Sequence, residues 1–190
     1  TDLSGGSYHI CALDSAGSIK CWGSDNHGQV TGAPSGVGYT AVTGGASHSC
    51  ALDSSGAIAC WGSDSDGQIT DALSGSGYTA VSAGLYHTCV LEPAGTIECW
   101  GSDSSGQVTG GFSGSDYTFV SGGGYYTCAM DSAGSIECWG YDRNGEVTDA
   151  PTDSGYTAMS AGGFHSCALD PSGSIACWGY DIQGQVSDAP

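Results

Sequence analysis

Hydrophobic and polar positions along the chain recur with a period of 39 residues and without a single insertion. The indole series is Trp22, Trp61, Trp100, Trp139 and Trp178, and two cysteine series keep the same spacing. A fixed period of this length is typical of proteins built from stacked structural repeats. The pattern predicts one domain of five repeats, at approximately residues 1–38, 39–77, 78–116, 117–155 and 156–190.

Each repeat predicts four short antiparallel strands. In the third copy they are residues 78–82, 87–91, 96–100 and, more weakly, 106–109, because apolar and polar residues alternate and β-branched or aromatic residues are enriched. Helical spacing with capping residues is missing. Four-stranded units every 40 residues or so predict the blades of a β-propeller, with a β-solenoid as the alternative.

The loop between the second and third strands of each copy ends in glycine, as in Ser15-Ala16-Gly17. Such a loop is typical of a three-residue hairpin connection whose last residue is left-handed. The implied register places Cys11 opposite Cys21, at a separation that a disulfide tolerates. We therefore expect five disulfides of this kind: Cys11–Cys21, Cys50–Cys60, Cys89–Cys99, Cys128–Cys138 and Cys167–Cys177. Symmetry also permits a uniform scheme between repeats, such as Cys21–Cys50.

Composition narrows the classes of partner and compartment. The chain has 20 Asp and Glu against only Lys20 and Arg143, for a formal net charge of −18 at pH 7. This charge disfavours nucleic acid and anionic membrane surfaces, and no apolar stretch reaches the roughly 20 residues of a membrane helix. Paired cysteines indicate an oxidising compartment, so we expect a secreted, extracellular or cell-surface protein in its mature form.

The repeat also resembles a known family. The string Ala-Gly-x-x-His-Thr-Cys-Ala-Leu-Asp-x-x-Gly-x-Ile-x-Cys-Trp-Gly-x-Asp-x-x-Gly-Gln-Val resembles the repeat of the regulator of chromosome condensation family, in particular its bacterial, secreted branch with paired cysteines. The resemblance covers essentially the whole chain and implies a propeller with one repeat's worth of strands per blade. Familiar members close with seven blades, whereas this chain has five repeats, and the family's turn Asn is Asp here. Exchange-factor activity on chromatin is not carried over, because acidity and disulfides argue against a nuclear DNA partner.

Two repeated positions are candidates for function. His9, His48, His87 and His165 share one position, which Tyr126 fills in the fourth copy; we favour a hydrogen bond to a neighbouring backbone over a metal site. The preceding residue is aromatic in four copies and Ser47 in the other. Aromatic side chains on the loops of one propeller face are favoured contacts for partners, although packing between blades is the alternative. These candidate binding residues are Tyr8, Tyr86, Tyr125 and Phe164.

The sequence therefore predicts an all-β, five-bladed propeller of four-stranded blades with one disulfide per blade. We expect the ring to close, with residues 1–4 adding a strand to the last blade. No catalytic set, metal site or cofactor motif is recognised, so we expect a non-enzymatic binding module for a protein or a glycan. The alternative is a structural subunit of an extracellular filament or lattice, which binds copies of itself.

Overall fold

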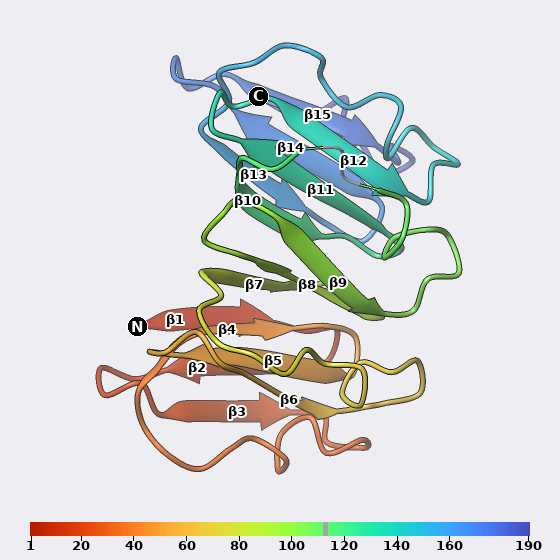
Figure 1. Cartoon of the computed structure of the whole chain (residues 1–190). Helices are drawn as coiled ribbons and strands as arrows, with labels where there is room; N and C mark the ends of the chain where they lie inside the picture. The colour runs from red at the N-terminus through yellow and green to blue at the C-terminus, as the bar shows by residue number, and fades with distance from the viewer. Residues whose placement is uncertain (112–113) are drawn as a thin grey trace.

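The computed structural model describes residues 1–111 and 114–190 and consists of five three-stranded antiparallel sheets (Figure 1). Each sheet, called a blade below, takes its three strands from one repeat in chain order. Blades 1 and 2 contain β1 (Asp2–Gly5), β2 (His9–Leu13), β3 (Ile19–Gly23), β4 (Tyr39–Gly44), β5 (His48–Asp53) and β6 (Ile58–Gly62). Blades 3 to 5 contain β7 (Ala80–Ala83), β8 (His87–Leu91), β9 (Ile97–Gly101), β10 (Tyr117–Gly122), β11 (Tyr126–Asp131), β12 (Ile136–Gly140), β13 (Ala158–Ala161), β14 (His165–Leu169) and β15 (Ile175–Gly179).

The hairpin within each blade has the register that the glycine-ended loops predict. In blade 1, Leu13 faces Ile19 and Cys11 faces Cys21, and Gly17 is left-handed with φ of 74°. The Cα atoms of the paired cysteines lie 4.1 Å apart in every blade. All five predicted disulfides are confirmed, and the alternative scheme between repeats is wrong.

The predicted fourth strand of each blade is wrong. In the third copy, residues 106–109 form hydrogen-bonded turns, in which the Gly110 N–H donates to the Gly106 carbonyl. The carboxylate of Asp103 accepts the backbone N–H groups of Val108 and Thr109. Because this carboxylate takes up donors that a strand would present to a neighbour, the segment curls into a turn instead of extending the sheet.

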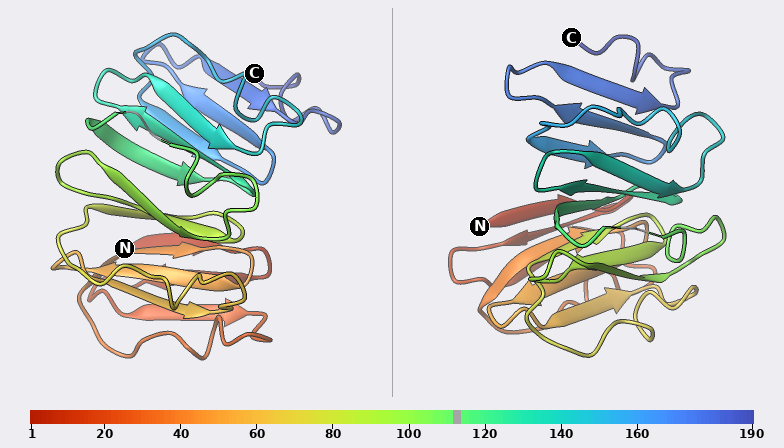
Figure 2. Two further views of the ribbon diagram at one scale, coloured as in Figure 1. Left: turned by 45° about the vertical axis from the view of Figure 1, so that its right-hand side comes forward. Right: turned by 45° about the horizontal axis from the view of Figure 1, so that its top comes forward.

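The ring is open, and the predicted closure by the N-terminus is wrong. Strand β1 pairs with β2 of its own blade, with Leu3 opposite Ala12, and not with the last blade. A short connection between β1 and β2 makes this local pairing inexpensive in chain entropy. Strand packing runs through the blades in chain order, and the C-terminal blade lies at the opposite end of the arc from blade 1 (Figures 1 and 2).

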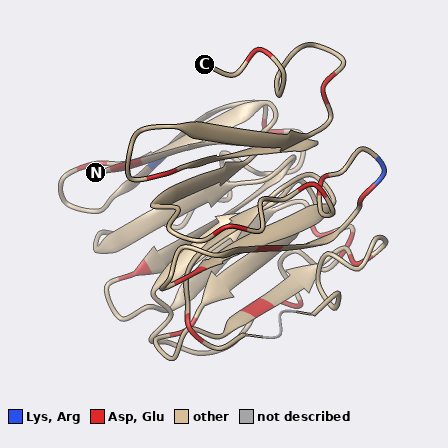
Figure 3. Ribbon diagram, turned by 90° about the horizontal axis from the view of Figure 1, so that it is seen from above, with Lys and Arg blue, Asp and Glu red and all other residues tan. Residues whose placement is uncertain are grey.

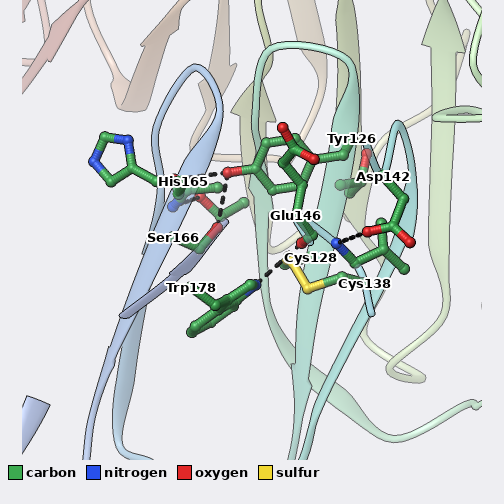
Figure 4. Close-up of a disulfide and its surroundings, with 12 residues drawn as sticks. Tyr126, Cys128, Cys138, Asp142, Glu146, His165, Ser166 and Trp178 are labelled. Atoms are coloured by element: carbon green, nitrogen blue, oxygen red, sulfur yellow. Dashed lines mark hydrogen bonds between the residues drawn. A yellow bond between two sulfur atoms is a disulfide. The ribbon is translucent and has the colours of Figure 1, made fainter. Parts of the chain in front are cut away.

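Consecutive blades are joined by one apolar contact that recurs at four junctions. Between blades 1 and 2, Leu13 and Ile19 of the first pack against Val42 and Trp61 of the second. The indole Nε1–H of Trp61 donates to the backbone carbonyl of Gln29, 2.9 Å away. The same bond joins Trp100, Trp139 and Trp178 to the carbonyls of residues 68, 107 and 146. The core of the protein is therefore a series of sheet-to-sheet interfaces, one of which is drawn in Figure 4.

The repeated histidine adds a polar bond to three of the four junctions, and Tyr126 adds one to the fourth. His48 Nε2 lies 2.9 Å from the hydroxyl of Thr88 in the next blade, and His9 and His87 make the same contact with Ser49 and Thr127. In blade 4, the Tyr126 hydroxyl reaches Ser166 of blade 5 at 2.8 Å. The expected hydrogen bond is present at His9, His48 and His87, but the predicted backbone partner is wrong, because the partner is a side-chain hydroxyl.

We predict that acid weakens these junctions. Burial lowers the pKa of His48 and of His87 to about 4, from 6.5. The unfolded chain therefore binds more protons between these two values, so the free energy of unfolding is largest above pH 6.5 and falls toward pH 4. The loss is on the order of 2–3 kcal/mol per histidine. Urea unfolding of wild type and of His87→Tyr at several pH values measures it. Tyrosine, which occupies this position in blade 4 as Tyr126, does not titrate in this pH range. The free energy of unfolding of His87→Tyr should therefore fall less between pH 6.5 and pH 4 than that of wild type. An equal fall in both proteins would contradict the assignment.

We further predict that each disulfide stabilises the fold. Replacing both Cys89 and Cys99 by Ala opens a loop with a sequence separation of 10 residues. The free energy of unfolding should fall by about 2 kcal/mol, because the unfolded chain gains entropy. Thermal unfolding followed by circular dichroism measures the change. The variant should keep its β-sheet spectrum, and a melting temperature equal to that of wild type would contradict the prediction.

Candidate binding face

Three of the four predicted binding residues lie together on the turns between the first and second strands of blades 3 to 5. The ring centroids of Tyr86 and Tyr125 are 5.2 Å apart, and those of Tyr125 and Phe164 are 6.3 Å apart. Each of these turns is short, so the residue before the second strand is held at the same end of every blade. The three rings therefore form a continuous surface across three blades.

The fourth predicted residue does not join them. Tyr8 lies on blade 1, exposes 78% of its surface and is separated from Tyr86 by blade 2, where Ser47 carries no ring. The missing ring at Ser47 interrupts the aromatic series. The prediction of one aromatic face spanning the propeller is therefore correct only for blades 3 to 5.

Two further rings, which the repeat pattern alone does not single out, complete the surface. Tyr141 lies 6.3 Å from Tyr125 and 6.1 Å from Phe164, and Tyr180 lies 6.4 Å from Phe164. The Tyr141 N–H donates to the Tyr125 carbonyl, so the two residues are cross-strand neighbours. The hairpin register could have revealed this, since the residue after each Trp-Gly pair faces the residue before the histidine. The aromatic cluster is thus Tyr86, Tyr125, Tyr141, Phe164 and Tyr180.

The electrostatic surroundings of the cluster are acidic. Burial, a hydrogen bond with Tyr86 and the nearby Asp66 carboxylate all raise the pKa of the Tyr125 phenol, which stays a neutral donor at physiological pH. Asp and Glu are spread over the loops around the propeller, with no single acidic side (Figure 3). The cluster therefore offers phenol hydroxyls and ring faces in a field that repels anions.

A cavity of about 240 Å³ opens between the inner strands of all five blades at the same turns. Its walls are almost entirely backbone, because glycines such as Gly44, Gly84 and Gly123 line it. At Gly84 a Cβ would come within 2.2 Å of the His87 ring, so the interblade histidine itself requires glycine there. The described residues that line the cavity offer peptide groups and no ionisable side chain.

The groups that this face presents are aromatic rings, phenol hydroxyls and backbone amides. In residues 1–111 and 114–190, no three His, Cys, Asp or Glu side chains gather as metal ligands would. The same residues contain no helix of the length and apolarity that a membrane span requires. Stacked rings, hydroxyls and backbone amides are the groups with which proteins recognise sugar rings, peptides and other side chains.

The fold and these repeated turns define a propeller-type repeat protein with a disulfide in each blade. The regulator of chromosome condensation (RCC1) repeat matches residues 1–29, 39–68, 78–107 and 156–185, and the chain belongs to this family. The fourth repeat, which lies outside these matches, is the one that has Tyr126 in place of the histidine and Glu146 in place of the buried glutamine.

Solved structures of the same architecture include two plant receptor ectodomains. The chain is 28% identical to the ectodomain of the Physcomitrella patens receptor kinase CR4, with a TM-score of 0.76 over 94% of this chain and 51% of that one. It is 26% identical to the CRINKLY WD40 ectodomain of the Arabidopsis thaliana receptor kinase ACR4, with a TM-score of 0.75 over 99% of this chain and 65% of that one. The chain thus spans less than two thirds of each.

Prp20p from Saccharomyces cerevisiae, whose binding to Gsp1p and histones has been described, is 17% identical. Its TM-score is 0.77 over 97% of this chain and 58% of that one, which shows the fold alone. A comparison with curated protein sequences finds no match.

We predict that the cluster contributes only modestly to the fold. Tyr125→Ser removes contacts with three neighbouring rings and should lower the free energy of unfolding by about 1–2 kcal/mol. The matched variant Tyr8→Ser removes an exposed ring and should change it by less than about 0.5 kcal/mol. Urea unfolding compares the two. If Tyr125→Ser unfolds the protein outright, the cluster belongs to the core and is not a binding surface.

Proposed function

We propose that this protein is a non-enzymatic, extracellular binding module that recognises a protein or a glycan through the aromatic cluster of blades 3 to 5. The observation that carries the proposal is the cluster itself: five rings from three blades meet on one face, each of them still partly exposed. Rings needed only for packing would be buried between blades, as the tryptophans of blades 2 to 5 are. Exposed aromatic groups that are held rigidly are favoured contact residues in interfaces.

The extracellular location is supported by the disulfides and by the relatives. All ten cysteines are paired, which favours an oxidising compartment. The two plant relatives are ectodomains of receptor kinases, so the same fold serves at a cell surface in those proteins. The net charge of −18 directs the choice of partner away from nucleic acid and anionic membranes.

A binding screen with matched variants tests the proposal. The wild-type protein is applied to an array of glycans and of purified extracellular proteins, and each hit is measured by calorimetry. The double variant Tyr86→Ser and Tyr125→Ser should weaken binding at least about 100-fold, because two central contact rings are lost. Serine is admissible here, since Ser47 occupies the same position in blade 2.

The control is Tyr8→Ser, whose ring lies outside the aromatic cluster and should leave the affinity unchanged. All variants must first show the wild-type circular dichroism spectrum. A ligand that binds the folded double variant as tightly as wild type would refute the proposed face.

A further inference from the structure

The turns that carry the aromatic cluster also carry a series of carboxylates. In each repeat, one residue separates the Trp-Gly pair from an aspartate. In blades 2 to 5 these aspartates are Asp64, Asp103, Asp142 and Asp181, and all four are exposed. The last two directly follow the rings of Tyr141 and Tyr180, and the Ser102 N–H, just before Asp103, donates to the Tyr86 carbonyl. Rings and carboxylates therefore lie at the same end of the blades.

Hydrogen bonds to the backbone hold these carboxylates in place. Oδ1 of Asp181 accepts the N–H groups of Val186 and Ser187 at 2.8 and 2.9 Å, and the other three aspartates make the same pair of bonds. The bonds from Ser187 and Val186 lower the pKa of the Asp181 carboxyl, which stays charged in mild acid. An asparagine carbonyl would accept the same two N–H groups, so the turn itself does not require the negative charge.

Negative charge also reaches the rings themselves. After burial and the hydrogen bond with Tyr86, the carboxylate of the exposed Asp66 is a further cause of the raised pKa of the Tyr125 phenol. The hydrogen bond joins the two phenols, so one of their two O–H donors is already used. The groups left over are mostly oxygen lone pairs and ring faces, and the face is the negative part of an aromatic ring.

One positive side chain stands against these acids. In residues 63–68, 102–107, 141–146 and 180–185, which form the turns after the Trp-Gly pairs of blades 2 to 5, Arg143 is the only Lys or Arg. It is exposed and follows Asp142. Carboxylates beside electron-rich ring faces attract a cation, and they repel acidic sugars and phosphate groups.

Arginine suits these groups better than any other side chain. Its guanidinium is planar and always charged, stacks on aromatic faces and directs five N–H donors toward carboxylates, whereas lysine offers a compact, strongly hydrated charge. In an extended peptide, side chains two residues apart lie on one side at a spacing of about 7 Å. Neighbouring rings of the cluster lie 5.2–6.4 Å apart, so successive guanidinium groups of such a peptide can reach successive rings.

We propose that the aromatic cluster recognises arginine side chains at alternate positions of an extended segment in a protein partner. This inference rests on the binding function proposed above and narrows it from a protein or a glycan to a basic peptide segment. The rings supply the stacking surfaces, and the aspartates at their edges supply the acceptors. Because both are held rigidly before the ligand arrives, little ordering of the face opposes binding.

Peptide binding measured by fluorescence anisotropy tests the proposal on the whole chain. The probe is a labelled peptide, Gly-Ser-Arg-Ser-Arg-Ser-Arg-Ser-Gly, and its partner has citrulline in place of each arginine, which keeps the shape and removes the charge. The arginine peptide should bind at least about tenfold more tightly than the citrulline peptide. Its affinity should fall as salt rises, because ions screen the carboxylates.

Matched variants separate recognition at this face from general attraction to an acidic protein. Tyr125→Ser should weaken binding of the arginine peptide at least about tenfold. The pair Asp66→Asn and Asp103→Asn should weaken it about fivefold. The control pair Asp14→Asn and Asp53→Asn removes the same charge from hairpin turns at the other end of the blades, where both carboxylates also accept backbone N–H groups, and should leave the affinity unchanged.

A gain of affinity provides a further arm. Arg143→Gln removes the one competing cation and should tighten binding of the arginine peptide about twofold. All variants must first show the wild-type circular dichroism spectrum.

Several outcomes would overturn the arginine proposal: no binding of the arginine peptide to wild type, equal affinity for the citrulline peptide, an unchanged affinity in Tyr125→Ser, or equal losses in the two Asn pairs. The binding function itself is judged separately. A glycan that binds wild type and is lost in the double variant Tyr86→Ser and Tyr125→Ser would support the binding face and overturn the choice of arginine.

Discussion

The structure depends on the contact between one blade and the next. No single three-stranded sheet can bury both of its faces, so each blade acquires a core only when its neighbour's tryptophan and an apolar residue of its neighbour's inner strand cover it. The indole N–H then has to find an acceptor, and the backbone carbonyl of Gln29 or its equivalent supplies it. Stability therefore accumulates along the chain, one junction at a time.

The polar bonds of the junction explain why a histidine is buried there and why a glycine lies beside it. His48 is fully buried, yet only its Nε2 has a partner, since Nδ1 makes no hydrogen bond. A neutral imidazole satisfies this arrangement, and a protonated one does not, because it carries a second N–H donor. Gly45 beside it leaves no room for a side chain, since a Cβ would lie 2.3 Å from the ring. The histidine and the glycine are thus two parts of one packing solution.

The same repetition leaves particular positions free to vary. The residue before the histidine and the residue after Trp-Gly project from the turns at one end of each blade, beyond the junctions. Blade 2 places Ser47 and Ser63 there, whereas blade 4 places Tyr125 and Tyr141. Substitution at these turns costs the core little, so a binding surface can differ between blades of one propeller while the scaffold stays constant.

The period of 39 residues, the hairpin register and the five disulfides follow from the sequence alone, because turn chemistry and the alternation of a strand are local rules. Tyr125 could likewise be named as a candidate binding residue, because local rules place it in the turn before the second strand. What the sequence could not show is whether residues 106–109 would extend a sheet, since that depends on where the Asp103 carboxylate finds its donors. Nor could it decide closure or the meeting of Tyr141 of blade 4 with Phe164 of blade 5. Both depend on the angle between blades, which the packing of side chains from different repeats determines.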